Sequence, residues 1–451
     1  MSEMAALFAR QWADLAVGHQ QEPAGRAPEW TTPHRVALEL KTAWLRDFTT
    51  ARQGEPTLLC TPFALHGATV ADLAPGHSLV AALRAAGLRR LFVVDWRSAT
   101  PDMRLLGIDD YLADLNVMVD QVGAPVDLIG LCQGGWLALI YAARFPKKVR
   151  KLVLAGAPID VRAAPSALSA LAGGSPLAMF QELVRLGDGI VPGHKALTLW
   201  GPATVDPGDV RALLGTDAPE GSAALAQLTA RFQEWYAWTV DLPGTYFLEV
   251  VNTFYKHNVL AAGHFVALGQ KIDLATVTTP VFLLAARDDE LVAPPQLFAV
   301  EKLVGTPAHE MHKATAPCRH VGLFMNKAVL EGVWPDIALA RGAGALGLRA
   351  CGEGVGVGAR AIHTCFPALS LYFGLDGCCA PRRPEEEMTI AELIFEQVKN
   401  LPEQAAREVL DFVGYIRERG ERAEWRDLMS AQAASLAPVW DNTEDQVWDD
   451  V

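Results

Sequence analysis

The chain has 451 residues, of which 51% are hydrophobic and 20% charged, and its formal net charge is −13. This length and apolar content predict a large buried core and more than one domain, and they exclude a globally disordered chain. The acidic balance argues against nucleic-acid binding by the large domain, because phosphate recognition needs clustered Lys and Arg. The 7 cysteines are too sparse for a disulfide scaffold and fit a reduced, cytoplasmic setting.

The N-terminal segment predicts an amphipathic helix rather than an export signal. Its apolar stretch is interrupted by Glu3, Arg10 and Asp14, whereas a signal peptide has an uncharged apolar core. The sequence has no charge-free run of about 18 apolar residues, so no transmembrane helix is expected.

Short apolar runs alternate with helical patterns over the first 340 residues. The runs that predict buried strands are 57–60, 91–95, 126–130, 151–155 and 281–285. The helical patterns between them include 76–86, 108–122 and 134–144. Continuous apolar strands separated by helices predict an α/β domain with a doubly wound, mainly parallel sheet. The chemistry of such a sheet is expected at the carboxyl ends of its strands.

The third predicted strand runs directly into a candidate nucleophile. Residues 130–135 read Gly-Leu-Cys-Gln-Gly-Gly, which is the G-x-C-x-G form of a nucleophile elbow, with Cys132 in the place of the usual serine. The elbow would place Sγ at the top of the sheet and at the N-terminus of the next helix, where the helix dipole favours a thiolate. The backbone N–H of Gln133 is then the expected first oxyanion donor.

A cysteine nucleophile needs a base and a group that orients the base. The loop after the strand at 281–285 carries the adjacent aspartates Asp288 and Asp289. Only one of the two can face a single histidine, and we select Asp289 with Asp288 as the alternate.

The base candidate is His320, which lies in a predicted loop and is followed by Val-Gly and an apolar helix. The run 309–313 is expected to be the last strand, which would put His309 and His312 on that strand as exposed residues. Cys318 is expected to be a packed thiol rather than a part of the site.

A second oxyanion donor is expected from the loop after the first predicted strand, residues 61–67. The backbone N–H of Phe63 or of Ala64 would serve, and the sequence does not choose between them. His66, in the same loop, is expected to have a structural role.

Several of these segments together resemble the catalytic domain of polyhydroxyalkanoate (PHA) synthases. The resemblance rests on residues 72–80, 93–98 and 130–135 and on 261–279, and it covers about residues 28–340. It implies an α/β-hydrolase fold with a helical cap inserted at about 158–270. It also implies a triad of Cys132, Asp289 and His320 that acts on (R)-3-hydroxyacyl thioesters or on their polyester.

The resemblance implies partners as well as chemistry. The substrate would be a hydroxyacyl-coenzyme A or the polymer at a granule surface, with no metal or other cofactor, and it leaves room for a homo-oligomer. Two observations leave the direction of the reaction open. The synthase pattern Asp-His-Ile-Val-Pro-Trp reads Asp-Glu-Leu-Val-Ala-Pro at 289–294, and residues 132–133 and 320–324 also resemble intracellular PHA depolymerases. A depolymerase or thioesterase with the same triad is therefore the alternative.

The cap segment is rich in aromatic side chains, which include Trp235 and Trp238. These residues are candidates for lining an apolar acyl channel over Cys132. An ordinary cap core is the equally weighted alternative, because their spacing is close to helical.

The last part of the chain differs in composition. Residues 388–451 contain 14 acidic and 6 basic residues, a net charge of −8, with two amphipathic helical patterns and an acidic tail. This module is similar to VapB-like antitoxins of a domain family of unknown function, which implies a mainly helical module and a basic toxin as partner. Before it, residues 341–387 are rich in Gly and Cys and predict an irregular linker. Read-through or a frameshift near residue 340 would explain such a fusion.

Overall fold

The computed structural model describes residues 27–200 and 207–339, all of which belong to one compact unit. The expectations for the N-terminal helix, the linker at 341–387 and the antitoxin-like module at 388–451 fall outside the described residues. None of the helices in the described part of the chain is long and apolar enough to cross a membrane.

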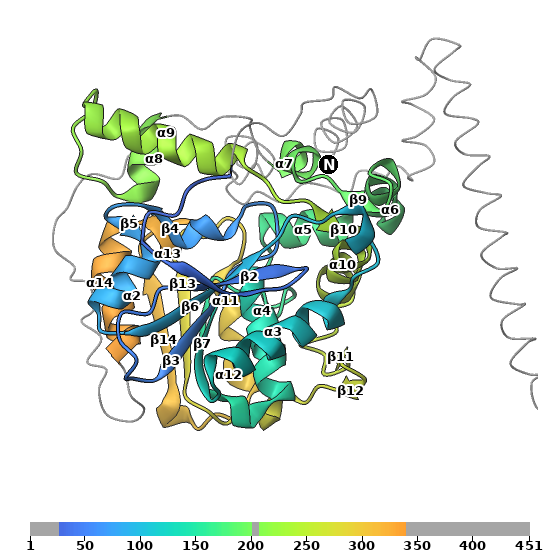
Figure 1. The fold of residues 1–451 in the computed structure, drawn as a ribbon. Coiled ribbons are helices and arrows are strands. Elements are labelled where there is room, and N and C mark those ends of the chain that lie inside the picture. Colours follow the sequence, from blue (N-terminus) through green and yellow to red (C-terminus); the bar gives the residue numbers. More distant parts are fainter. Residues whose placement is uncertain (1–26, 201–206, 340–451) are drawn as a thin grey trace, which may run out of the picture. The chain divides into compact units, whose positions relative to one another are not determined.

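An eight-stranded sheet forms the centre of the described unit (Figure 1), in the order β1-β2-β6-β3-β7-β8-β13-β14. Strand β2 runs antiparallel to both of its neighbours, and every other pair in this sheet is parallel. The strands are β1 (Arg35–Glu39), β2 (Ala43–Asp47), β3 (Pro56–Cys60), β6 (Arg90–Trp96), β7 (Val126–Leu131), β8 (Val149–Ala155), β13 (Val281–Ala286) and β14 (Met311–Ala316). The predicted mainly parallel α/β sheet is confirmed.

The inner strands are apolar throughout because both faces of the sheet are buried. In β13, Val281, Leu283 and Ala285 belong to one hydrophobic cluster, whereas Phe282 and Leu284, which alternate with them, belong to another. Successive side chains of a strand point to opposite faces, so each cluster covers one face.

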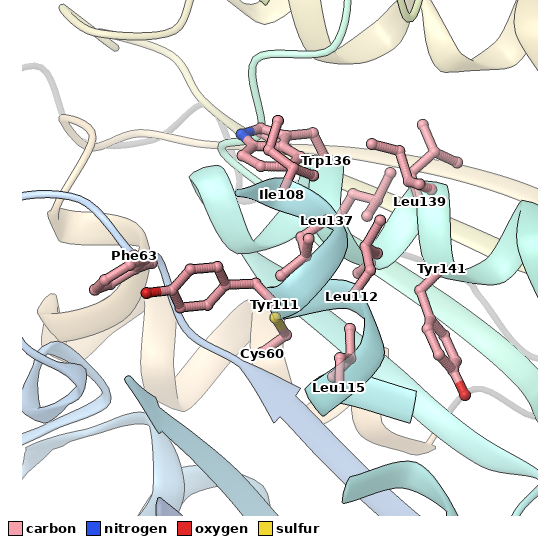
Figure 2. Close-up of a cluster of buried hydrophobic side chains, with 14 of the residues drawn as sticks. Cys60, Phe63, Ile108, Tyr111, Leu112, Leu115, Trp136, Leu137, Leu139 and Tyr141 are labelled. Carbon is pink, nitrogen blue, oxygen red and sulfur yellow. The ribbon is translucent and has the colours of Figure 1, made fainter. Parts of the chain in front are cut away.

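Helices cover both faces of the sheet. The first cluster contains residues of α3 (Ile108–Val122), α4 (Gln133–Arg144), α11 (Pro294–Phe298) and α12 (Val300–Leu303). The second contains residues of α2 (Leu79–Ala85), α13 (Gly322–Met325) and α14 (Lys327–Leu339). On the first face, Tyr111 of α3 lies against Phe63 with ring centroids 4.7 Å apart (Figure 2). This contact links α3 to the loop that follows β3.

A mainly helical insertion lies between β8 and β13. Its main helices are α5 (Ala167–Gly174), α6 (Leu177–Leu186), α7 (Gly193–Trp200), α8 (Pro207–Leu214), α9 (Ala223–Ala237) and α10 (Gly244–Val250), followed by the π-helical segment η4 (Val251–Lys256). Two short strand pairs complete it, β9 (Ile190–Val191) with β10 (Leu242–Pro243) and β11 (Val266–Ala267) with β12 (Gln270–Lys271). In Figure 1, α8 and α9 lie beyond the same end of the sheet as α5 and α7. This is the inserted helical cap that the resemblance implies.

The five predicted strands are confirmed with shifts of up to two residues, and the helices at 108–122 and 134–144 to within one residue. The helix predicted at 76–86 begins only at Leu79. Gly76 has φ +80°, so it makes a left-handed turn between β4 (Asp72–Ala74) and β5 (His77–Ser78), and the Ser78 side chain caps the helix by accepting the Ala81 N–H. Strands β1 and β2 lie outside the predicted elements.

The resemblance segment at 72–80 has a structural role. Asp72 is fully buried, and its carboxylate accepts hydrogen bonds from the backbone N–H and the hydroxyl of Thr32, both at 2.7 Å, and from the hydroxyl of Ser78 at 2.5 Å. Three donors compensate the cost of burying the carboxylate. Asp72 therefore fixes the segment before β1 to the start of α2.

Replacing Asp72 with Ala is expected to lower the free energy of unfolding by about 2–4 kcal/mol, because three buried donors lose their acceptor at about 1–3 kcal/mol for each unsatisfied group, with partial relaxation. Urea denaturation measures this change. Glu220→Ala, at an exposed position, is the matched control and should alter it by less than about 0.5 kcal/mol. Equal stability of the two variants would show that the Asp72 network does not hold the N-terminal segment.

Candidate active site

Cys132 occupies a sharp turn between β7 and α4. Its backbone has φ 49° and ψ −120°, a strained conformation for a non-glycine residue that costs on the order of 1–3 kcal/mol. Two hydrogen bonds hold it: the Cys132 N–H donates to the Ala155 carbonyl at 2.8 Å, and the Gly135 N–H donates to the Cys132 carbonyl at 2.9 Å. The half-buried thiol is thereby fixed at the carboxyl end of the central strands.

The glycines around Cys132 are required by close backbone contacts. A Cβ on Gly134 would lie 2.3 Å from the carbonyl oxygen of Cys60, and a Cβ on Gly130 would lie 2.5 Å from Cα of Gly135. Real Cβ atoms do not approach other atoms so closely. The G-x-C-x-G-G spacing therefore permits the close approach of β7, α4 and the end of β3.

His320 and Asp289 form a buried pair beside this turn. The His320 Nδ1–H donates to Oδ2 of Asp289 at 2.8 Å, with Oδ1 at 3.0 Å, and the two side chains are only 4% and 1% exposed. Asp289 is itself oriented, because its Oδ1 accepts the backbone N–H groups of Leu291 and Val292 at 3.0 and 2.8 Å. Of the two adjacent aspartates, Asp289 is the one that binds the histidine.

His320 also interacts with the side chain of Cys132, and both residues line the same cavity. Burial by itself lowers the pKa of His320, but the charge of Asp289 and the interaction with Cys132 outweigh it and raise the pKa well above its usual value. The three side chains that the sequence predicts as a triad are thus brought together, in the order Cys132, His320, Asp289. This arrangement can form a thiolate–imidazolium pair.

Glu290 is a site residue that the sequence reasoning missed. Its Oε2 accepts the backbone N–H of His320 at 3.3 Å, and its Oε1 lies 3.3 Å from Nη2 of Arg319. The pair Glu290–Arg319 therefore runs beside the pair Asp289–His320 and joins the same two loops. The only sequence signal was its place next to Asp289, where the PHA synthase pattern has His.

The predicted oxyanion positions are on α4 and on the loop after β3. Gln133 is the first residue of α4, so its backbone N–H has no partner within the helix. In the loop after β3, Ala64 lines the cavity beside Cys132, whereas Phe63 does not. Phe63 is instead buried among Trp96, Tyr111 and Tyr246. A donor at Phe63 or Ala64 stays a prediction.

A cavity of about 200 Å³ adjoins the Cys132 thiol and is lined almost entirely by apolar surface. Cys132, Gln133 and His320 line it, and the cap supplies aromatic side chains, among them Trp235, Tyr236, Tyr246, Phe247 and Tyr255. Several of these rings are also buried in the hydrophobic clusters. The cap aromatics therefore serve both of the roles considered, as cavity wall and as core.

Trp238, expected beside Trp235 in the acyl channel, does not line this cavity. Helix α9 ends at Ala237, so the helical spacing that would align the two tryptophans does not extend to Trp238. Its indole packs 3.7 Å from the position of a Cβ on Gly67, and its carbonyl oxygen lies 3.4 Å from Nδ1 of His66. His66 packs against Trp235 with tilted rings whose centroids are 4.6 Å apart, and burial lowers its pKa to about 4, so it is a neutral packing residue.

The remaining candidates lie away from the nucleophile. His309 is exposed in the turn η6 (Ala308–Glu310) rather than on β14, because Pro307 precedes it and cannot donate to a sheet. His312 is on β14, where it is half-buried and stacks on Phe282 at 4.5 Å. Cys318 is a packed thiol whose pKa burial raises to about 12. Among residues 27–200 and 207–339, no group of three His, Cys, Asp or Glu side chains is placed to hold a metal.

Comparison with known proteins places this site in a family context. A family model described as "alpha/beta hydrolase fold" matches residues 75–327. The poly(3-hydroxyalkanoate) polymerase subunit PhaC of Synechocystis sp. is 29% identical over 284 residues, which is 59% of this chain and 72% of that protein. The PhaC subunit of Allochromatium vinosum is 27% identical over 303 residues, or 64% and 81% of the two chains. Among solved structures, a monoacylglycerol lipase of Paleococcus ferrophilus is similar at 16% identity, covering 66% of this chain and 96% of the lipase with a TM-score of 0.42.

Replacing Asp289 with Asn is expected to lower the pKa of His320, because the amide keeps the shape but removes the charge. In the native chain the raised pKa keeps His320 protonated above pH 6.5. The stabilisation from the charged pair is therefore complete below the unfolded pKa of about 6.5 and is lost as the pH rises through the folded pKa. In the variant this stabilisation is lost at a lower pH.

The rate of Cys132 alkylation by iodoacetamide at pH 7.5 should fall about tenfold or more in Asp289→Asn, since an adjacent opposite charge is worth roughly 1–3 pKa units. Asp288→Asn is the control, and an equal loss there would contradict the assignment.

Replacing Glu290 with Ala is expected to lower the free energy of unfolding by about 1–3 kcal/mol, because the buried N–H of His320 loses its acceptor. The alkylation rate of Cys132 should fall as well, since the loop that carries His320 is released. Glu290→Gln retains an acceptor for that N–H and should recover most of both properties. If Gln behaves like Ala, the charge contact with Arg319 matters and the hydrogen bond does not.

Proposed function

We propose that this chain, which belongs to the alpha/beta hydrolase fold family, is an acyltransferase of the PHA synthase type with Cys132 as its nucleophile. The relatives named PhaC and the family match indicate an enzyme. The observation that supports the finer proposal is that Cys132 and His320 line one apolar cavity and interact with each other, while Asp289 accepts the Nδ1–H of His320. The proposed substrate is an (R)-3-hydroxyacyl thioester of coenzyme A.

The first half-reaction would transfer the acyl group to the enzyme. His320 takes the thiol proton, and Sγ of Cys132 attacks the thioester carbonyl. A bond forms between Sγ and the carbonyl carbon, the bond from that carbon to the coenzyme A sulfur breaks, and the departing thiolate receives the proton from His320. Asp289 stabilises the imidazolium throughout, because it accepts the Nδ1–H. The developing oxyanion would be held by the N–H of Gln133 and by a second N–H at Phe63 or Ala64.

The second half-reaction decides between polymer synthesis and hydrolysis. His320 would deprotonate the incoming hydroxyl, which attacks the acyl-Cys132 and releases the thiol. A 3-hydroxyacyl alcohol gives a longer ester, whereas water gives the free acid. The apolar cavity supports transfer to an alcohol, because apolar walls bind a hydroxyacyl chain and offer water few hydrogen-bond partners.

Hydrolysis, as a PHA depolymerase or a thioesterase, is the second candidate. The observation that favours it is Glu290, which follows Asp289 where the synthase pattern has His. Glu290 contacts Arg319 and accepts the His320 N–H. A carboxylate at this position does not supply the second imidazole that the synthase pattern has there. The triad chemistry up to the acyl-cysteine would be the same in both cases.

Incubation of the full chain with 3-hydroxybutyryl-coenzyme A tests the proposal. Thiol release followed with a chromogenic disulfide, together with product size by chromatography, should show coenzyme A release and an ester oligomer. Free acid in place of the oligomer would favour the thioesterase alternative. Cys132→Ala should lower the rate by at least about a thousandfold, because loss of a nucleophile removes the covalent route.

Cys318→Ala is the matched control, because Cys318 is a free cysteine in the same region that is buried outside the cavity. It should retain turnover. Turnover that survives in Cys132→Ala would overturn the assignment of the nucleophile. No release of coenzyme A by the unaltered chain would overturn the thioester as substrate.

A further inference from the structure

The cavity beside Cys132 contains a polar group that the proposed mechanism does not use. Tyr255 lines the cavity and is 8% exposed. Within residues 27–200 and 207–339, its hydroxyl is buried and has no hydrogen-bond partner. The neighbouring Tyr246 differs, because its hydroxyl donates to the carbonyl oxygen of Phe63 at 3.5 Å. In the same described part of the chain, the indole N–H of Trp235, another residue of the cavity wall, is also buried without a partner, so the Tyr255 hydroxyl is one of the unpaired donors in an otherwise apolar wall.

Tyr255 is close to the nucleophile. Burial raises the pKa of its phenol, and the charge of Cys132 raises it further, which requires the two groups to be near each other. The residue belongs to the π-helical segment η4, and such segments are rare and frequent at functional sites. The hydroxyl thus stays a neutral donor in every pH range in which Cys132 reacts.

The unpaired hydroxyl is a cost in the free protein. A buried hydroxyl without a partner costs about 1–3 kcal/mol relative to a paired one, and phenylalanine would fill the same space without that cost. Tyr111 carries a similar unpaired hydroxyl, but it lies outside the cavity and packs against Phe63. Tyr255 differs because it lines the cavity and because the charge of Cys132 acts on its phenol.

The chemistry of the proposed acyl group identifies one atom that needs such a donor. In a 3-hydroxyacyl-cysteine the carbonyl oxygen is two bonds from Sγ and would accept a hydrogen bond from the N–H of Gln133. The next polar atom is the 3-hydroxyl, four bonds from Sγ, and the remaining atoms of the chain are apolar. A hydroxyl placed in an apolar cavity must find a hydrogen-bond partner there.

We propose that Tyr255 is a specificity-determining residue that donates a hydrogen bond to the 3-hydroxyl oxygen of the acyl group bound at Cys132. This inference rests on the proposed function, since it assumes a 3-hydroxyacyl thioester at that cysteine. A site built to pair a buried hydroxyl rejects the analogue that lacks it, because the protein donor is then left unpaired. The chain therefore prefers 3-hydroxyacyl groups to unsubstituted acyl groups of the same length.

The test compares kcat/KM for 3-hydroxybutyryl-coenzyme A and butyryl-coenzyme A in the unaltered chain and in Tyr255→Phe. The unaltered chain should prefer the hydroxylated thioester, and the variant should reduce that preference about tenfold. The thermal midpoint of Tyr255→Phe without substrate should be equal or higher, because an unpaired hydroxyl has been removed. If Tyr255 has only a structural role, Tyr255→Phe will lower the thermal midpoint and leave the preference intact. Either result would overturn the inference.

Tyr111→Phe is the matched control, because it removes an unpaired buried hydroxyl that does not face the cavity, and the preference should not change. Calorimetry can make the same comparison without turnover. It measures the binding of both thioesters to Cys132→Ala, with and without Tyr255→Phe. If the unaltered chain releases no coenzyme A from either thioester, the proposed function fails. If it turns both over and Tyr255→Phe keeps the preference, only the role of Tyr255 fails.

Discussion

The close approach of three backbone segments at Cys132 is the constraint on which the candidate site depends. A side chain at Gly134 would strike the carbonyl oxygens of Cys60 and Thr61, so the start of α4 can touch the end of β3 only through glycine. The same contact brings the loop after β3, which carries Phe63 and Ala64, to the thiol. One steric requirement thus positions Cys132 at a helix N-terminus and places the loop expected to hold the oxyanion beside it.

The sheet supplies the rest of the site through its strand order. Strands β13 and β14 are parallel neighbours, with Ala286 opposite Ala316 at their carboxyl ends, so the loops that follow them leave the sheet side by side. Asp289 and Glu290 on one loop meet His320 and Arg319 on the other. Gly156, after β8, leaves the space for the imidazole, because a Cβ there would lie 3.1 Å from Cε1 of His320. The histidine is therefore held from three directions, by contacts between segments that are distant in sequence.

Local patterns predicted the parts of this site that local sequence determines. The apolar strands follow from burial on both faces, and the elbow at Cys132 follows from a tight turn that only glycine neighbours allow. There was a physical reason why only one of Asp288 and Asp289 faces the histidine. There was none for selecting Asp289, because the direction of the loop depends on the adjacent strand. Trp238 lies outside the cavity lining because α9 ends before it. The contacts of Glu290 and the proposed role of Tyr255 depend on residues far along the chain.

The segments that carry the resemblance to PHA synthases mostly build the scaffold around Cys132, His320 and Asp289. His77 lies 2.9 Å from the carbonyl oxygen of Met325, which ends the helix after His320, and the Trp96 indole donates to the carbonyl oxygen of Thr61 in the loop beside Cys132 at 2.9 Å. Such contacts serve any reaction that passes through an acyl-cysteine. They therefore support the fold and the thioester attack more strongly than they support polymer synthesis. The direction of the reaction depends instead on which nucleophile enters the cavity, and so on the cap residues, such as Trp235 and Tyr255, that shape it.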